Sequence, residues 1–278
     1  MVNFTLNKIT TPTRFFGLFL SLASIEVFFS ILSEGQITTA SFAVSIVIAF
    51  LMSFVLAWLA SLLHLTRIHM VAVFWINLFV VVYLNNMIEA YFFTDVFTSV
   101  SFFLSTLFVT FLFTGIEATV AGYFLTLEGE DKSLIQALRE YFAQRTLFSW
   151  GLRIALASIV YFPIYFFFGA LVSPFIIEYY QDSSLLKIPP FSVIIPLEIF
   201  RGFLYVLVLL LVIAVSKGEK RSTFFILLAL LFIFGALIPL MSAPTLPPAI
   251  IPFHLVEILA DSVVYGYALI RLLWQPRK

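Results

Sequence analysis

The stretch TFFILLALLFIFGALIPLMS, residues 223–242, contains no charged side chain. A run of about 20 apolar residues is long enough to cross the ~30 Å hydrocarbon core of a bilayer as an α-helix. Similar runs fill most of the 278-residue chain, of which 62% is hydrophobic and 11% is charged. In an ordinary soluble domain about a quarter of the residues are charged. The sequence therefore predicts an integral membrane protein built from helices.

Polar breaks divide the chain into eight predicted spans and leave no room for a soluble domain. The apolar runs lack the alternation of apolar and polar residues that is typical of membrane β-strands. We therefore expect one membrane domain, residues 1–278, folded as an all-α polytopic bundle. The predicted spans are residues 14–33, 38–63, 70–92, 97–127, 148–176, 191–215, 223–242 and 253–274.

The distribution of basic residues predicts the orientation, because cytoplasmic loops are enriched in lysine and arginine. With the N-terminus in the cytoplasm, only Lys187 falls in an outer loop. Both termini then lie in the cytoplasm, which requires an even number of spans. A plasma or inner membrane fits this pattern. The predicted cytoplasmic residues are Lys8, Arg14, Arg67, Lys132, Arg139, Arg145, Lys217, Lys220, Arg221, Arg271, Arg277 and Lys278.

The longest polar insertion predicts a cytoplasmic amphipathic helix at residues 131–146. Ser133 and Gln136 have the spacing of a capping box, and apolar residues follow at helical intervals. Such a helix lies on the membrane surface with its apolar face toward the lipid.

Nine ionisable side chains lie inside the predicted spans. An ionisable side chain that faces lipid is costly, so such residues usually mark a pocket, a pathway or a buried pair. The nine are Glu26, Glu89, Glu117, Arg153, Glu198, Arg201, His254, Glu257 and Asp261.

Most of these residues are predicted to converge in the outer half of the membrane. At 1.5 Å per residue, Glu198 and Asp261 lie roughly 10 and 12 Å below the outer ends of their spans. Glu26, Asn85 and Asn86 come to a similar depth, and Glu89 and Glu257 lie nearer the surface. His254, Glu257 and Asp261 share one helix face because they are three and four residues apart. We expect Glu26, Asn85, Asn86, Glu89 and Asp261 to bind a substrate or an ion.

The predicted outer cluster has an excess of carboxyl groups, which protons, a metal cation or a cationic substrate must compensate. Arg201 could instead neutralise Glu198 as an i, i+3 pair. Glu117 and Arg153 lie nearer the cytoplasmic side, where we expect a structural ion pair.

The motifs that the sequence has and lacks restrict which cofactors and reactions can be expected. The chain has no cysteine and no glycine-rich nucleotide loop, so we expect no nucleotide cofactor. A divalent metal is the possible cofactor, with His254 and Glu257 as candidate ligands. Phe200-Arg201-Gly202 resembles the end of the E-E-x-x-x-R motif of the CAAX-type intramembrane endopeptidases. The resemblance covers three residues, and Pro196 and Leu197 stand where that family has its glutamates, so no catalytic role is transferred.

Three functions fit these residues. The first is a membrane-embedded hydrolase or transferase acting on a lipid or membrane peptide, with Glu198 or Glu257 as general base, His254 as acid/base, Arg201 as anion partner and Asn86 as orienting donor. The second is a proton- or cation-coupled transporter of small solutes. The third is a non-catalytic subunit or scaffold. The expected partners are the lipid bilayer and a small-molecule, lipid or peptide substrate, and no nucleic acid.

Overall fold

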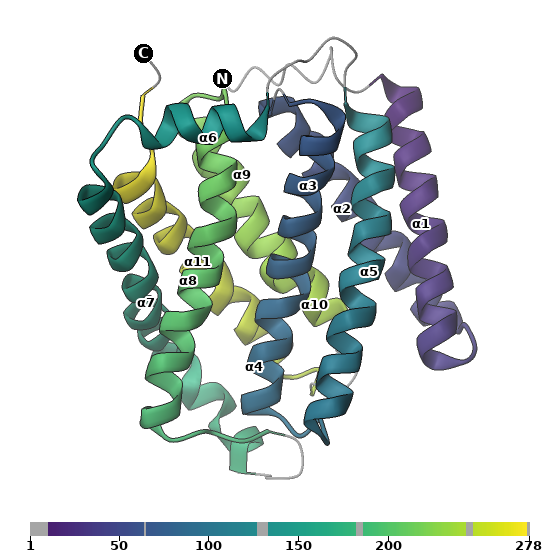
Figure 1. The fold of residues 1–278 in the computed structure, drawn as a ribbon. Helices are drawn as coiled ribbons and strands as arrows, with labels where there is room; N and C mark the ends of the chain where they lie inside the picture. The colour runs from purple at the N-terminus through teal and green to yellow at the C-terminus, as the bar shows by residue number, and fades with distance from the viewer. Residues whose placement is uncertain (1–10, 64, 127–132, 182–185, 243–246, 277–278) are drawn as a thin grey trace.

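The computed structural model describes residues 11–63, 65–126, 133–181, 186–242 and 247–276, and its helices confirm the predicted all-α bundle (Figure 1). Eight helical spans are long and apolar enough to cross a membrane. The third span comprises α3, η1 and α4, and the seventh comprises α9, η2 and α10. The elements are α1 (Pro12–Glu34), α2 (Thr39–Leu62), α3 (Arg67–Asn77), η1 (Leu78–Leu84), α4 (Asn85–Phe93), α5 (Val100–Leu125), α6 (Leu134–Phe142), α7 (Leu147–Gln181), α8 (Phe191–Val215), α9 (Lys220–Ala229), η2 (Leu230–Leu237), α10 (Ile238–Met241) and α11 (Ile251–Leu273).

Local signals explain where several helices begin and end. Thr38 and Ser41 form a reciprocal capping box at the start of α2. Pro12 stands in the first turn of α1, and Gly35 ends that helix with a φ of 74°, a conformation that glycine adopts without strain. The short break between α1 and α2 is therefore a true turn, and the first two spans are separate helices.

Helix α8 is the most buried of the spans. In its most apolar window 67% of the residues are buried, against 17% in the corresponding window of α7. Helices α7 and α11 pack together, α7 also packs along α8, and the third span packs against α8 and η2. Polar side chains on α8 are thus surrounded by protein, whereas the outer faces of α1, α5 and α7 carry exposed leucine and phenylalanine side chains.

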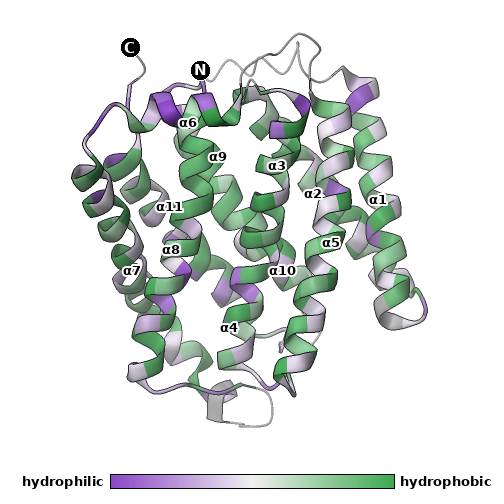
Figure 2. Cartoon of the chain, in the orientation of Figure 1, coloured by the Kyte–Doolittle hydropathy of each residue, from purple (hydrophilic) through white to green (hydrophobic). Residues whose placement is uncertain are grey.

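Hydrophilic residues gather at the ends of the bundle and at one level between α4 and α8 (Figure 2). We call the end that holds α6 the basic end, since Arg67, Arg139, Lys217 and Arg271 lie there, and the opposite end the Lys187 end. α1 begins and α11 ends at the basic end, as an even number of spans requires.

The amphipathic helix α6 is shorter at both ends than predicted, and residues 127–132 lie outside the described part of the chain. The predicted capping box does not form, because Ser133 makes no side-chain cap and Gln136 donates to Glu140 at 2.9 Å. Tyr141 anchors α6 by donating to the carbonyl of Leu273 at the end of α11. Burial raises the pKa of Tyr141 well above its usual value, which keeps this hydroxyl a donor.

Candidate functional site

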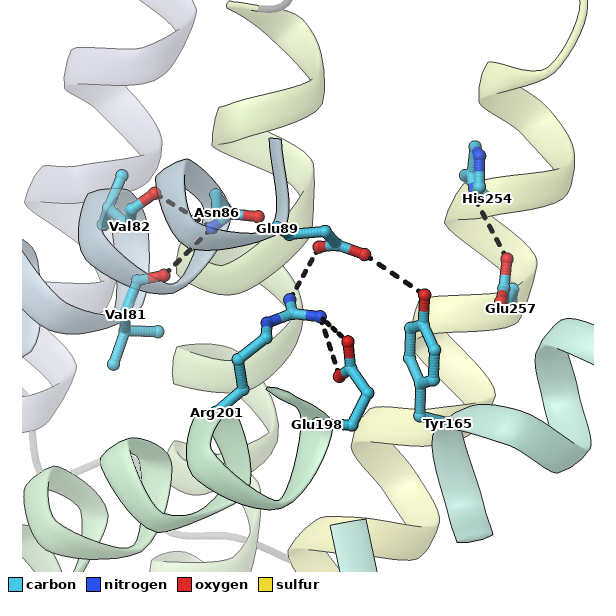
Figure 3. Close-up of polar contacts among 9 residues, drawn as sticks. All are labelled: Val81, Val82, Asn86, Glu89, Tyr165, Glu198, Arg201, His254 and Glu257. Atoms are coloured by element: carbon cyan, nitrogen blue, oxygen red, sulfur yellow. Dashed lines mark hydrogen bonds and ion pairs between the residues drawn. The ribbon is translucent and has the colours of Figure 1, made fainter. Parts of the chain in front are cut away.

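Arg201 lies at the centre of an ion-pair network inside the bundle (Figure 3). Its Nη1 donates to both carboxylate oxygens of Glu198, at 3.0 and 2.9 Å, and its Nη2 lies 2.6 Å from Glu89 Oε2. The Arg201 side chain is 3% exposed and that of Glu198 is fully buried. Removing a buried ion from water is costly, so a buried arginine requires partners of this kind. The network fastens α8 to α4.

The irregular helix η1 leads directly into α4, which carries Asn86 and Glu89. Its π-helical hydrogen bonds run from residue i to i+5, a pattern that is rare in proteins and frequent at functional sites. The Asn86 amide donates to the carbonyls of Val81 and Val82, at 3.2 and 3.0 Å. Asn86 thus caps the end of η1 with its own side chain, one turn before Glu89 (Figure 3).

His254 and Glu257 form a hydrogen-bonded pair on α11, as their spacing predicts. His254 Nδ1 lies 3.0 Å from Glu257 Oε2, and the two side chains are 19% and 7% exposed. Gly169 on α7 lets Glu257 approach that helix, because a Cβ atom added at residue 169 would lie 3.1 Å from Glu257 Oε1. The pair is therefore held between α11 and α7.

Two adjoining cavities connect the pair to the ion-pair network. The outer chamber has a volume of about 230 Å³, and the inner chamber about 40 Å³. Both are lined by Asn86, Glu89, Tyr165 and Ile258, so Glu89 stands between them. The outer chamber is further lined by Phe93, Thr94, Leu186, Leu240, His254 and Glu257, and the inner one by Tyr161, Arg201, Tyr205, Asp261, Ser262 and Tyr265.

The tyrosines around Arg201 belong to the candidate site, and the sequence analysis missed them. The Tyr165 hydroxyl donates to Glu89 Oε1 at 3.4 Å, and the Arg201 guanidinium lies 5.9 Å from the ring centres of both Tyr161 and Tyr165. Tyr265 donates to the carbonyl of Gly202 at 3.2 Å. The four-residue step from Tyr161 to Tyr165 on an otherwise lipid-facing helix is the signal that could have identified them.

Glu26 does not belong to this site. The structure instead places its carboxyl group near that of Glu117, so that two buried carboxyl groups lie close together between α1 and α5. Neither oxygen of Glu117 has a hydrogen-bond partner among the described residues. Two carboxylates side by side in an apolar interior repel each other, so the pair requires a proton or a cation.

Arg153, predicted to pair with Glu117, has a different partner. Its Nη1 donates to the carbonyl of Leu272 at 2.6 Å, in the last turn of α11. The last carbonyls of a helix have no partner within the helix and carry partial negative charge, so a cation is favoured there. Arg153 therefore fixes the end of α11 and takes no part in the outer site.

The remaining predicted residues are placed as follows. Asn85 is fully buried, its amide has no partner among the described residues, and it lines neither chamber. Asp261 lines the inner chamber. Within the described part of the chain no three histidine, aspartate or glutamate side chains gather closely enough to hold a metal ion, so His254 and Glu257 would have to hold one without a third such ligand.

Comparisons with known protein families, with curated proteins and with solved structures found no match. The three-residue resemblance of Phe200-Arg201-Gly202 to the CAAX-type endopeptidases thus gains no support, and the function has to be argued from the site itself.

Proposed function

We propose that the protein is a membrane-embedded hydrolase whose substrate is amphipathic and reaches the outer chamber from the Lys187 end. The observation that carries this proposal is the His254–Glu257 pair on the wall of a chamber whose other lining is largely apolar. A histidine held by a carboxylate through one ring nitrogen presents the other nitrogen as a base.

In the proposed reaction, Glu257 accepts a hydrogen bond from the Nδ1–H of His254 and so fixes the tautomer in which Nε2 is unprotonated. His254 Nε2 takes a proton from a water molecule, whose oxygen adds to a carbonyl carbon of the substrate. The bond to the leaving oxygen or nitrogen then breaks, and His254 returns the proton to that atom. One water is consumed, and an acid and an alcohol or amine are released.

Two other residues support the reaction. Tyr165 lines the same chamber, and its 3.4 Å bond to Glu89 is long, so its hydroxyl is suited to donate to the oxyanion that forms on the substrate. Glu198, a candidate general base in the sequence, is fully buried with both oxygens bound to Arg201. We therefore assign the base to His254 and regard Glu198 as the counter-ion of Arg201.

Heavy-oxygen water provides a test that works before the substrate has been identified. The purified protein is reconstituted with membrane lipid extracts or apolar peptide mixtures, and the products are analysed by mass spectrometry. We expect heavy oxygen in newly formed carboxyl groups, and a loss of about 10²–10⁴-fold in its incorporation for His254→Gln. The matched control is Val256→Ala, on the same helix but 67% exposed toward the lipid. Incorporation that is equal in His254→Gln and wild type would refute the assignment.

A proton- or cation-coupled transporter is the second candidate, and the Glu26–Glu117 pair is the observation that favours it. This pair is a second buried acidic group, remote in sequence from the outer site and carried by different helices. Sealed proteoliposomes separate the two proposals. Solute uptake that follows an imposed pH gradient and disappears in Glu117→Gln, without heavy-oxygen incorporation, would favour transport.

A further inference from the structure

Carboxyl groups outnumber cations around the two chambers. Glu89, Glu257 and Asp261 line them, and Glu198 lies directly behind Arg201. Among the described residues Arg201 is the one lysine or arginine that lines either chamber, and two of the four carboxylates already bind it. Even with a protonated His254, this part of the chain leaves Asp261 without a cation of its own.

Asp261 also has an oxygen atom without a partner. The residue is 5% exposed, and its Oδ1 makes no hydrogen bond to any described residue. It lines the inner chamber, where Glu257 and Glu89 act on it electrostatically. A buried acceptor without a donor costs about 1–3 kcal/mol, and more when it is charged. Asp261 therefore points to a ligand that donates hydrogen bonds and carries positive charge.

The chambers offer little to an anionic group. The Lys187 ammonium, at the outer end of the bundle, lies 2.8 Å from Asp95 Oδ1, and the Arg201 side chain is 3% exposed. A phosphate or carboxylate in the outer chamber would instead meet the carboxyl groups of Glu89 and Glu257. Charge thus discriminates against anionic head groups.

The size and lining of the outer chamber further restrict the class of ligand. Its volume of about 230 Å³ is below the ~300–1,000 Å³ of typical ligand sites, so it accommodates a small head group with part of an apolar chain. Phe93, Leu240 and Ile258 supply apolar lining for that chain. A peptide backbone would also require hydrogen-bond partners for its own amide and carbonyl groups.

We propose that the ligand of this site is a lipid-type amine, an apolar chain that ends in an ammonium group, with the ammonium beside Glu89 and Asp261, where the two chambers adjoin, and Glu257 on the wall of the outer chamber. The proposal rests on the proposed function for its identification of the ligand as a substrate, which must then also carry an ester or amide bond, but not for the binding itself. The ammonium supplies the positive charge and the donors that the unpartnered Asp261 oxygen lacks, and the chain occupies the apolar part of the outer chamber.

Three probes of equal chain length test the charge requirement: hexylammonium, hexanol and hexanoate. Each is titrated into the full-length protein in a non-ionic detergent and followed by calorimetry. We expect hexylammonium to bind at least ten-fold more tightly than hexanol, which corresponds to about 1.4 kcal/mol, and hexanoate to bind most weakly. Equal affinity for hexylammonium and hexanol, or a preference for hexanoate, would overturn the proposal.

Variants test the location of the ammonium. Asp261→Asn and Glu257→Gln are expected to lower the affinity for hexylammonium at least ten-fold and to leave that for hexanol unchanged. The matched control is Glu178→Gln, which removes the same charge from an exposed position on α7 that lines neither chamber. An equal loss in Glu178→Gln would show a diffuse electrostatic effect and would overturn the site.

Two further measurements separate the ligand class from the proposed function. Tighter binding of an acetylated Leu-Lys-Leu amide than of hexylammonium would overturn the assignment to a lipid-type amine. Selective hexylammonium binding without heavy-oxygen incorporation would leave the amine site standing and refute the hydrolase. Heavy-oxygen incorporation without selective binding of hexylammonium would support the hydrolase and refute the amine site.

Discussion

Arg201 on α8 and Glu89 on α4 are joined by an ion pair of 2.6 Å, although 112 residues separate them in the sequence. This contact positions Glu89, which lines both chambers, because Arg201 binds its carboxylate from the inner chamber. The stability of the bundle and the shape of the site therefore depend on the same pair.

Removing the positive charge of Arg201 is expected to destabilise the protein strongly. Arg201→Met leaves Glu198 and Glu89 without their cation, and breaking a buried pair in this way costs about 3–5 kcal/mol. The double variant Glu198→Leu/Arg201→Met removes the two most buried charges, leaves only the partly exposed Glu89, and should recover at least half of that loss. The measurement is the temperature at which half of the protein remains monodisperse after heating. A double variant no more stable than Arg201→Met would contradict this account.

The Glu26–Glu117 pair is expected to reduce stability. Replacing either carboxyl group by an amide removes the repulsion and supplies a donor to the remaining carboxyl group. We predict that Glu26→Gln and Glu117→Gln each raise the apparent melting temperature by about 2–4 °C at neutral pH, as expected for ~1 kcal/mol in a chain of this size. If both variants lower it, the pair holds a cation that the amide cannot bind.

Gly169 is expected to act as a positioning residue for Glu257. In Gly169→Ala the new methyl group displaces Glu257 and, through it, His254 by a few tenths of an ångström. A displacement of ~1 Å can cost 100-fold in rate, so we expect a loss of about ten-fold in heavy-oxygen incorporation with an unchanged melting temperature. Gly151→Ala on the same helix is the matched control, because a Cβ atom there meets no neighbour within 4 Å. Equal rates in the two variants would exclude this role.

Arg153 is expected to stabilise the end of α11 without affecting the site. Arg153→Met removes a charged donor from the Leu272 carbonyl and should cost about 1.5–3 kcal/mol. Arg139→Met removes the same charge from an exposed position on α6 and should change the melting temperature little. Hexylammonium affinity should be unchanged in both variants, and its loss in Arg153→Met would show that α11 transmits the change to the site.

The orientation can be measured directly, because the chain contains no cysteine. Gln136→Cys places a thiol on exposed α6 at the basic end, and Ile188→Cys places one at the Lys187 end, where residue 188 is 57% exposed. In intact cells a membrane-impermeant thiol reagent should label Ile188→Cys alone, and Gln136→Cys only after the membrane is opened. The reverse pattern would invert the predicted topology.

The sequence predicted the spans well because each is a local property of the chain. An apolar run between polar breaks requires a helix in lipid whatever its neighbours are, and the structure has eight such spans within a few residues of the predicted bounds. The i, i+3 spacing likewise predicted that Glu198 and Arg201 share one helix face and that His254 and Glu257 share another, and in the structure each pair is in contact.

What the sequence could not predict is which helices become neighbours. Glu26 and Asn86 have similar depths by counting residues, but α1 packs against α2 and α5, while α4, which carries Asn86, lies beside the Arg201 network. Counting residues gives the depth of a side chain in the membrane, but it does not say which helices lie next to each other. Glu117 therefore pairs with Glu26 rather than with Arg153, whose partner is a backbone carbonyl and leaves no charge pattern in the sequence.

The π-helical segment η1 makes the exact number of residues before Asn86 important. A π-helical turn takes up about one residue more than an α-helical turn, so α-helical hydrogen bonds over the same seven residues, Leu78–Leu84, would rotate everything that follows by about 100°. Asn86 and Glu89 would then turn away from the chambers together, even though every site residue was still present. In this span the length of the chain is as specific a determinant of the site as the identity of its side chains.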